Sequence, residues 1–216
     1  MLPGPGPRAI LDIGCGPGAQ TLVLARHTEA AIMAVDIHQP YLDRLNAAAL
    51  RESLSHRVQT RCVSMEALDY TSASFDLIWA EGAAYFMGLA SAIRCWRRFV
   101  VAGGCIVLTE ATWLTSERSA EAVNFWMRAY PSMASIEENV ARARAEGLTV
   151  LDWFVLPEQD WWRDYLDPLE RRISFLSGQV GEVPGLLEVM EEARAEIAIC
   201  RRHLGLFGYA FFLLRL

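Results

Sequence analysis

The chain has 216 residues with a formal net charge of −6, and 53% of its residues are hydrophobic. This length is sufficient to bury a core without disulfides or metals, and the hydrophobic content excludes an intrinsically disordered protein. There is no block of lysine and arginine that could neutralise a phosphate backbone, so we expect no nucleic-acid partner.

The first half of the chain alternates short apolar runs with segments of helical spacing. We predict strands at residues 9–13, 32–36, 58–63, 75–80 and 105–110, the last after a turn at Gly103–Gly104, and helices at 19–27, 39–53 and 88–100. This alternation is typical of βαβ units and a parallel sheet. Such sheets bind ligands at the carboxyl ends of their strands.

After Glu110 the alternation stops and helical segments dominate. We predict helices at 116–130, 135–146, 168–177 and 184–203, and strands at 149–156 and at the closing segment GYAFFLLR. The helical block at about 158–205 lies between two predicted strands, so we interpret it as an insertion. We therefore predict one α/β domain over residues 1–216. Its doubly wound, Rossmann-like and mostly parallel sheet has seven strands, with helices on both faces and a helical insertion before the last strand.

A glycine-rich turn follows the first predicted strand, in the stretch ILDIGCGPGAQT. Gly14, Gly16 and Gly18 allow a tight turn and a close approach of the backbone to a ligand. The helix that begins near Gly18 directs its first N–H groups at the same place. The stretch also fits the dinucleotide pattern G-x-G-x-x-A, so the pattern by itself does not identify the cofactor.

Two acidic residues and a proline narrow the choice of cofactor. Asp12 lies two residues before the first glycine, where a carboxylate repels a pyrophosphate but suits an ammonium group. Pro17 removes one N–H donor that a phosphate would use. Asp36 ends the second strand, where an acid accepts hydrogen bonds from ribose hydroxyls of either NAD or S-adenosylmethionine. Together these residues favour S-adenosylmethionine, because its methionyl part carries an ammonium group.

Four blocks of the chain, in order, carry a family resemblance. LDIGCGPG, VDIHQPYLDRL, SFDLIWAEGAAYFMG and WRRFVVAGGCIVLTE resemble the class I S-adenosylmethionine-dependent methyltransferases over residues 8–112. The chain is similar to the small-molecule group that includes ubiquinone/menaquinone C-methyltransferase-like proteins. The resemblance implies a cofactor-binding half at 1–112 and a substrate-side half at 113–216. Family members have a longer segment before the first strand than MLPGPGPR. Either the chain is shortened, or it is incomplete, or the helices after Glu110 cover the cofactor instead.

The resemblance also assigns roles to individual residues. The methionyl part would lie against Asp12, Gly14, Cys15, Gly16, Gly18 and Ala80, the ribose against Asp36, and the adenine against Ile37, Ser64, Met65 and Glu66. Many members have an acid in place of Ser64, and a hydroxyl accepts a hydrogen bond more weakly than a carboxylate does. His38 would line the ribose and adenine rim.

Glu81 and Tyr85 follow the fourth strand and are the candidate catalytic residues. A general base is needed only when the nucleophile must lose a proton. Glu81 could be that base, an anchor for the substrate, a ligand for the cofactor or a member of a structural ion pair. Tyr85 faces the same pocket or belongs to the core. The aromatic residues Trp113, Trp126 and Tyr130 either form a substrate wall or pack as core.

The remaining features predict a cytoplasmic enzyme acting on a small molecule. The five cysteines and four histidines show neither metal-ligand spacing nor a C-x-x-C pair, so we expect reduced thiols and no metal. MLPGPGPR lacks the apolar stretch of a signal peptide, and the apolar C-terminus is shorter than a membrane span. The segment with Trp153, Trp161 and Trp162 covers the active site or contacts a second copy in a homodimer. Two other functions stay open, namely a cofactor-binding protein without catalysis and an NAD-dependent oxidoreductase.

Overall fold

The computed structural model describes residues 6–179 and 183–216. The first five residues of MLPGPGPR, which contribute to the prediction about a signal peptide, lie outside this range. The chain forms two compact units, unit 1 with Met1–Glu110, Glu137–Phe154 and Phe211–Leu216, and unit 2 with Ala111–Ile136 and Val155–Ala210. Each unit therefore combines separate stretches of the chain. The prediction of a single domain over residues 1–216 stays a prediction.

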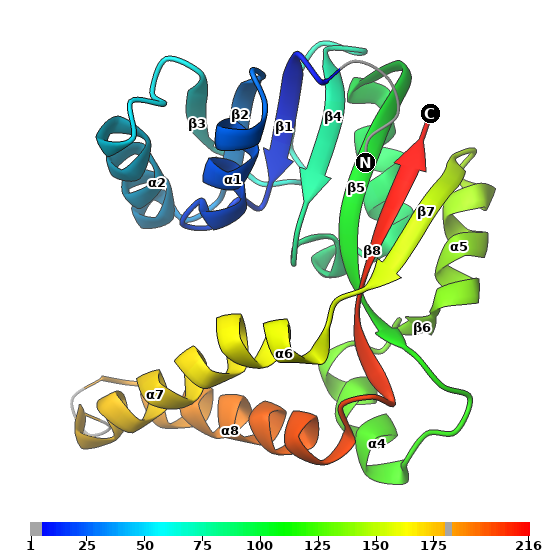
Figure 1. Cartoon of the computed structure of the whole chain (residues 1–216). Helices are drawn as coiled ribbons and strands as arrows, with labels where there is room; N and C mark the ends of the chain where they lie inside the picture. Colours follow the sequence, from blue (N-terminus) through cyan, green and yellow to red (C-terminus); the bar gives the residue numbers. More distant parts are fainter. Residues whose placement is uncertain (1–5, 180–182) are drawn as a thin grey trace. The chain divides into compact units, whose positions relative to one another are not determined.

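Unit 1 is built on a mostly parallel sheet (Figure 1). The strands of the sheet are β1 (Ala9–Ile13), β2 (Ala31–Asp36), β3 (Val58–Cys62), β4 (Phe75–Ala80), β5 (Val100–Trp113), β7 (Thr149–Val155) and β8 (Phe207–Arg215), in the order β3-β2-β1-β4-β5-β8-β7. The residues of β5 after Glu110, of β7 after Phe154 and of β8 before Phe211 are assigned to unit 2. Neighbouring pairs from β3 to β5 are parallel, and Figure 1 shows β8 running against β5 and β7. The predicted Rossmann-like sheet is confirmed.

The helices of unit 1 follow the predicted alternation. They are α1 (Ala19–His27), α2 (Gln39–Arg51), α3 (Leu89–Trp96) and α5 (Ile136–Ala145), with short 3-10 turns η1 (Ala84–Phe86) and η2 (Arg97–Phe99). In α2, Leu42, Leu45 and Ala49 are buried on one face, because their spacing repeats at helical intervals. Pro40 lies in the first turn of this helix, where its missing N–H is tolerated. The central β1 is buried almost throughout, as parallel strands covered on both faces are.

The structure corrects the prediction of a turn at Gly103–Gly104. Strand β5 continues through both glycines, and the β4–β5 register shifts between Phe75 and Leu77, as at a β-bulge. A Cβ on Gly104 would lie 2.8 Å from the carbonyl oxygen of Asp76. The two glycines therefore lie at an irregularity inside the strand, and Gly104 allows the backbones of β4 and β5 to approach closely. The helix predicted at 88–100 is also shorter, because α3 ends at Trp96 and η2 follows.

Unit 2 is mainly helical. Its elements are α4 (Ala120–Ala129), β6 (Ala134–Ser135), α6 (Glu158–Trp161), the π-helical turn η3 (Trp162–Leu166), α7 (Asp167–Leu176), η4 (Ser177–Gln179) and α8 (Leu186–His203). The ring of Phe207 packs edge-on against Trp113, Trp126 and Trp161. The helices from Glu158 to His203 agree with the predicted insertion. The sequence did not predict β6, which pairs with Thr112 and Trp113.

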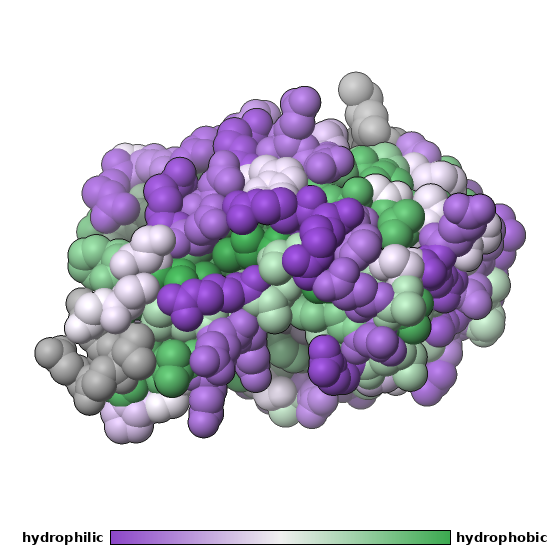
Figure 2. All heavy atoms as spheres, turned by 90° about the horizontal axis from the view of Figure 1, so that it is seen from below, coloured by the Kyte–Doolittle hydropathy of each residue, from purple (hydrophilic) through white to green (hydrophobic). Residues whose placement is uncertain are grey.

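Several surface and composition features bear on the earlier expectations. Among residues 6–179 and 183–216, no helix is long and apolar enough to cross a membrane, and no group of three or more potential metal ligands occurs. All five cysteines are free thiols. Hydrophobic residues reach the surface between hydrophilic ones on the face shown in Figure 2. Large exposed hydrophobic side chains include Phe175 and Val189 on the helices of unit 2.

Candidate active site

A cavity of about 620 Å³ opens in unit 1, after the carboxyl ends of β1 to β4. Residues from four strand-to-helix connections line it, as the parallel topology predicts. They are Gly14, Gly16, Val35, Asp36, Ile37, His38, Tyr41, Val63, Ser64, Met65, Glu66, Gly82, Ala83 and Phe86. A volume of this size is typical of sites for small ligands and cofactors.

The glycines after β1 shape one wall of this cavity. Gly14, Gly16 and Gly18 all have positive φ angles, of 69°, 54° and 90°, a conformation that favours glycine. A Cβ on Gly14 would lie 2.5 Å from the Cβ of Ala83, and one on Gly18 would lie 2.3 Å from Cδ1 of Leu45. A Cβ on Gly16, in contrast, would meet nothing within 4 Å. Gly14 and Gly18 thus permit close packing of the protein, whereas Gly16 leaves its face open to the cavity.

Asp36 is a half-buried carboxylate at the cavity wall, and backbone amides hold it in place. Gly16 N donates to Oδ2 and His38 N donates to Oδ1, each at 2.9 Å. The side chain therefore joins the glycine turn to the end of β2. Each carboxylate oxygen accepts from more than one donor, so both keep capacity for hydroxyl groups of a ligand.

Asp12 lies beneath the glycine turn and is completely buried. Thr21 Oγ1 donates to its Oδ2 at 2.5 Å, and Oδ1 has no hydrogen-bond partner among the residues that the structure describes. The pKa of the Asp12 carboxyl is raised from 3.8 to about 7, chiefly because the group is buried and to a smaller extent because of the charges of Glu81 and Asp36. A buried carboxylate with one unsatisfied oxygen suits a positively charged group, which would favour its ionised form.

The segment after β3 forms the opposite wall. Ser64, Met65 and Glu66 line the cavity, and Glu66 N donates to Ser64 Oγ at 3.3 Å. The indole N–H of Trp96 donates to the Met65 carbonyl oxygen at 3.1 Å, which fixes this segment to α3. The Met65 side chain, unlike its carbonyl group, stays available to a ligand.

Comparison with known proteins identifies the part of the chain that carries this site. Residues 10–104 match the family described as a methyltransferase domain. Over these residues the chain is similar to that family, in agreement with the predicted class I S-adenosylmethionine-dependent methyltransferase, and we call residues 10–104 the methyltransferase segment. The similarity to the ubiquinone/menaquinone group stays a prediction. All residues that line the cavity lie within this methyltransferase segment.

Individual relatives agree with this family. The chain is 28% identical over 153 residues to a 27-O-demethylrifamycin SV methyltransferase of Amycolatopsis mediterranei, covering 68% of the chain and 56% of the relative. A methyltransferase of Geobacter sulfurreducens, solved with S-adenosyl-L-homocysteine, superposes with a TM-score of 0.79 at 19% identity. The match covers 97% of this chain and 84% of the Geobacter chain. The 4+2 cyclase SpnF superposes with a TM-score of 0.78 at 23% identity, and the match covers 97% of this chain and 74% of the SpnF chain. These structures show a shared fold.

The match covers only part of most relatives. The chain spans between 39% and 62% of the length of four curated relatives, all named as methyltransferases. The family resemblance therefore describes the cofactor-binding segment best. The reaction and the acceptor of this chain need separate arguments from its own residues.

The structure separates the predicted cofactor residues of this methyltransferase segment into two groups. Gly14, Gly16, Asp36, Ile37, Ser64, Met65 and Glu66 line the cavity. Asp12, Cys15 and Ala80 are completely buried, and Gly18 packs on Leu45, so these four lie behind the wall. His38 lines the cavity, as predicted for the rim. The roles of all these residues toward a cofactor stay predictions.

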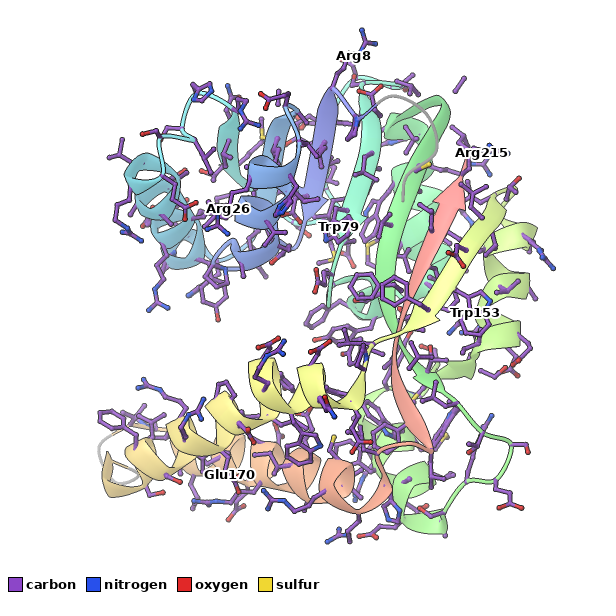
Figure 3. The ribbon with its side chains drawn as sticks, viewed as in Figure 1. Arg8, Arg26, Trp79, Trp153, Glu170 and Arg215 are labelled. Carbon is purple, nitrogen blue, oxygen red and sulfur yellow. The ribbon has the colours of Figure 1, made fainter. Side chains whose placement is uncertain are left out.

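Glu81 and Tyr85 lie next to the cavity but not on its lining. Glu81 follows β4, and its Oε2 accepts a hydrogen bond from Trp79 Nε1 at 3.2 Å; Trp79 is labelled in Figure 3. Desolvation by the surrounding protein raises the pKa of the Glu81 carboxyl. Tyr85 stacks on Phe86 with ring centroids 4.1 Å apart, and Phe86 is the aromatic residue that lines the cavity.

Sequence reasoning missed several lining residues, chiefly Tyr41 and Phe86. Tyr41 lies three residues after His38, and the two rings meet edge-on at 4.5 Å. The helical spacing of residues 38 and 41 was a signal that could have located Tyr41 beside the predicted rim. Phe86 lies in η1, where no periodicity indicates which of two adjacent aromatic rings faces a cavity.

The predicted substrate residues belong to unit 2. Trp113, Trp126 and Tyr130 are all buried, and Trp113 and Trp126 pack around Phe207. The indole Nε1 of Trp126 has no hydrogen-bond partner among the residues that the structure describes. Trp161 is also buried in this unit, whereas Trp153, on β7, is 44% exposed. A role of these residues in substrate binding stays a prediction.

Proposed function

We propose that this chain transfers a methyl group from S-adenosylmethionine to a small molecule. The observation that carries the proposal is the cavity of the methyltransferase segment, with the open face of Gly16 and the carboxylate of Asp36 on its lining and the buried Asp12 behind its wall. Each group matches a part of the cofactor. A pyrophosphate bound at the glycine turn would be repelled by the charge of Asp12 beneath that turn, which is the main argument against a dinucleotide.

The residues around the cavity would bind and orient the cofactor. When bound, S-adenosylmethionine supplies a methyl group that its sulfonium centre already activates. Asp36 would accept hydrogen bonds from the ribose hydroxyls, because two amides keep its carboxylate fixed. The side chains of Ile37 and Met65 would contact the adenine. The first N–H groups of α1 would donate hydrogen bonds to the carboxylate of the methionyl part. The charge of Asp12 would attract its ammonium group.

Glu81 would serve the acceptor. Its raised pKa makes the carboxylate a stronger base than an exposed one, which suits it to take a proton from a hydroxyl or amine nucleophile. For a nucleophile without a proton to lose, Glu81 would act as an anchor. Tyr85 would support this site through its stacked neighbour Phe86, which lines the cavity.

The other parts of the function are inferred from charge and composition. The net charge of −6 supports a small molecule and opposes nucleic acid as the acceptor. The buried indole N–H of Trp126 offers a donor that supports a substrate role for this residue, beside Trp113 and Tyr130. We also propose that residues 1–216 work as one catalytic domain in the cytoplasm. A homodimer, with Trp153 among its contacts, is a further proposal.

Calorimetry with S-adenosylhomocysteine and NADH tests the cofactor. We expect binding of S-adenosylhomocysteine, and Asp36→Ala should weaken it by about 1–3 kcal/mol, as expected for lost hydrogen bonds to a charged group. Asp43→Ala, an exposed acid on α2, is the matched control and should bind normally. Tight binding of NADH alone would overturn the proposal, and an unchanged affinity in Asp36→Ala would refute the ribose assignment.

A transfer assay separates an enzyme from a protein that only binds the cofactor. The full chain is incubated with S-adenosylmethionine labelled in its methyl group and with a metabolite extract, and labelled products are identified by mass. A labelled small molecule that depends on the protein supports catalysis. Cofactor binding without any labelled product, across extracts of several kinds, would favour a binding protein that has no methyltransferase activity.

A further inference from the structure

Unit 2 contains a second cavity, of about 630 Å³, between α4, the η3–α7 segment and α8. Its lining residues are Phe125, Arg128, Ala129, Tyr165, Leu169, Val189, Glu192, Ala193, Ala195 and Glu196. None of them lines the cavity of the methyltransferase segment. The methyl-transfer proposal uses none of them either, so this cavity needs its own explanation.

Helical spacing places these residues on three facing surfaces. On α8, Val189, Glu192, Ala193 and Glu196 recur at intervals of three and four residues, which puts them on one face. The same intervals relate the lining residues of α4 and those of the η3–α7 segment. The cavity is therefore walled by the surfaces of α4 and α8 and by the segment in which the π-helical turn η3 leads into α7.

Side-chain contacts hold these helices together near the C-terminal end of α8. Arg201 Nη2 pairs with Glu170 Oε2 of α7 at 2.9 Å, and Glu170 is labelled in Figure 3. His203 Nε2 lies 2.8 Å from Glu121 Oε2 of α4. The lining residues of α8 lie earlier in the helix, and two of them, Ala193 and Ala195, have short side chains that leave space. The cavity is thus a consequence of small residues between helices that are fixed nearby.

The chemistry of the lining is acidic and aromatic. Tyr165 Oη donates to Glu196 Oε2 at 3.1 Å, which orients that carboxylate. Burial raises the pKa of the Glu196 carboxyl, and a nearby cation would offset that unfavourable burial of its charge. Glu192 adds a second carboxylate one turn away, so the lining carries two acids and one base, Arg128. The rings of Phe125 and Tyr165 can also attract a cation through their faces.

We propose that this cavity binds an organic cation, an alkyl or aryl ammonium compound with an apolar body. Glu196 and Glu192 hold the positive charge, and Phe125 and Leu169 contact the apolar body. Arg128 weakens the binding, because its charge repels the ligand. The site is separate from the proposed methyl transfer, and it does not depend on S-adenosylmethionine being the cofactor.

Binding of benzyltrimethylammonium to the full-length chain, measured by calorimetry, tests this proposal. Neopentylbenzene, its neutral isostere, should bind about tenfold more weakly or worse, because it has the same shape without the charge. Glu196→Gln should weaken binding of the cation about tenfold. Glu191→Gln is the matched control, since Glu191 is exposed on α8 and lies outside the cavity. It should bind like the unmodified chain.

Two further variants keep the test decisive. Ala193→Leu fills the cavity without changing charge and should abolish binding, while its helix propensity is similar. Arg128→Gln should tighten binding of the cation severalfold. Weaker binding in Arg128→Gln would indicate an anionic or zwitterionic ligand and would overturn the proposal. Equal affinities for the cation and its neutral isostere, or equal behaviour of the Glu191 and Glu196 variants, would overturn it as well. Circular dichroism confirms that each variant is folded.

Discussion

The buried Asp12 should make the stability of this protein fall as the pH rises. Its carboxyl has a folded-state pKa of about 7, compared with an ordinary value of 3.8, chiefly because burial disfavours its charge. Between these two pH values the folded chain holds a proton that the unfolded chain has lost. Stability from this proton is therefore complete below about pH 4 and is lost as the pH rises toward 7. Asp12→Asn keeps the size of the side chain and removes the titration.

The size of the effect follows from the two pKa values. The difference between 3.8 and about 7 corresponds to about 4 kcal/mol in the free energy of unfolding, lost at about 1.4 kcal/mol per pH unit. We therefore compare the unfolding free energies of Asp12→Asn and of the unmodified chain without ligand. The difference between them should shift in favour of Asp12→Asn when the pH is raised from 4 to 8. Asp12→Asn should also bind S-adenosylhomocysteine more weakly, since the neutral amide no longer attracts an ammonium group.

Urea unfolding at several pH values between 4 and 8 measures this effect. The quantity of interest is the difference in unfolding free energy between Asp12→Asn and the unmodified chain, because the other titrating groups cancel in it. Glu29→Gln, an exposed acid shortly after α1, is the control for exchanging a carboxylate for an amide on the surface. A difference for Asp12→Asn that stays constant from pH 4 to 8 would refute the reasoning.

Three other substitutions give separable results. Gly18→Ala should lower the unfolding free energy by about 3 kcal/mol, because its Cβ would overlap Leu45 and its φ angle is 90°, and thermal melts measure this. Gly16→Ala should cost only about 1–2 kcal/mol of stability, from its positive φ, yet weaken S-adenosylhomocysteine binding, because its Cβ enters the cavity; equal effects of both glycines on binding and stability would contradict this. Glu81→Gln should reduce turnover at least about tenfold while unfolding changes by less than about 1 kcal/mol, and a fully active variant would remove Glu81 from the site.

The sequence predicted the cofactor side of the fold well, because local patterns determine it. An apolar run that stops before Gly14 locates strand β1, and one that ends in Asp36 locates β2; the glycines between these strands have positive φ angles. Parallel topology then brings the ends of four strands to one edge. The cavity follows from these few facts, and the residues Ser64 to Glu66 are placed in it by the same rule.

Other features depend on geometry that residue types do not encode. Glycine is common both in turns and in β-bulges. The pair Gly103–Gly104 therefore predicts a turn where the structure continues β5. The sequence predicts a helix that begins at Pro168, whereas the helical path starts at Glu158 and passes through a π-helical turn before α7. The choice between Tyr85 and Phe86 as the lining aromatic depends on a single 3-10 turn. These are cases where tertiary context decides between locally equivalent alternatives.

The way the two units share the chain bears on how such a protein can diversify. Unit 2 consists of two segments of the chain, Ala111–Ile136 and Val155–Ala210. The first segment begins within β5, and the second begins within β7 and ends within β8. Neither segment contains the glycine turn, Asp36 or the residues whose amides donate to Asp36. Insertions, deletions or exchanges in these stretches can therefore accumulate over evolution while the cofactor-binding residues keep their order in the gene. By the same connectivity, no single cut of the chain yields either unit by itself.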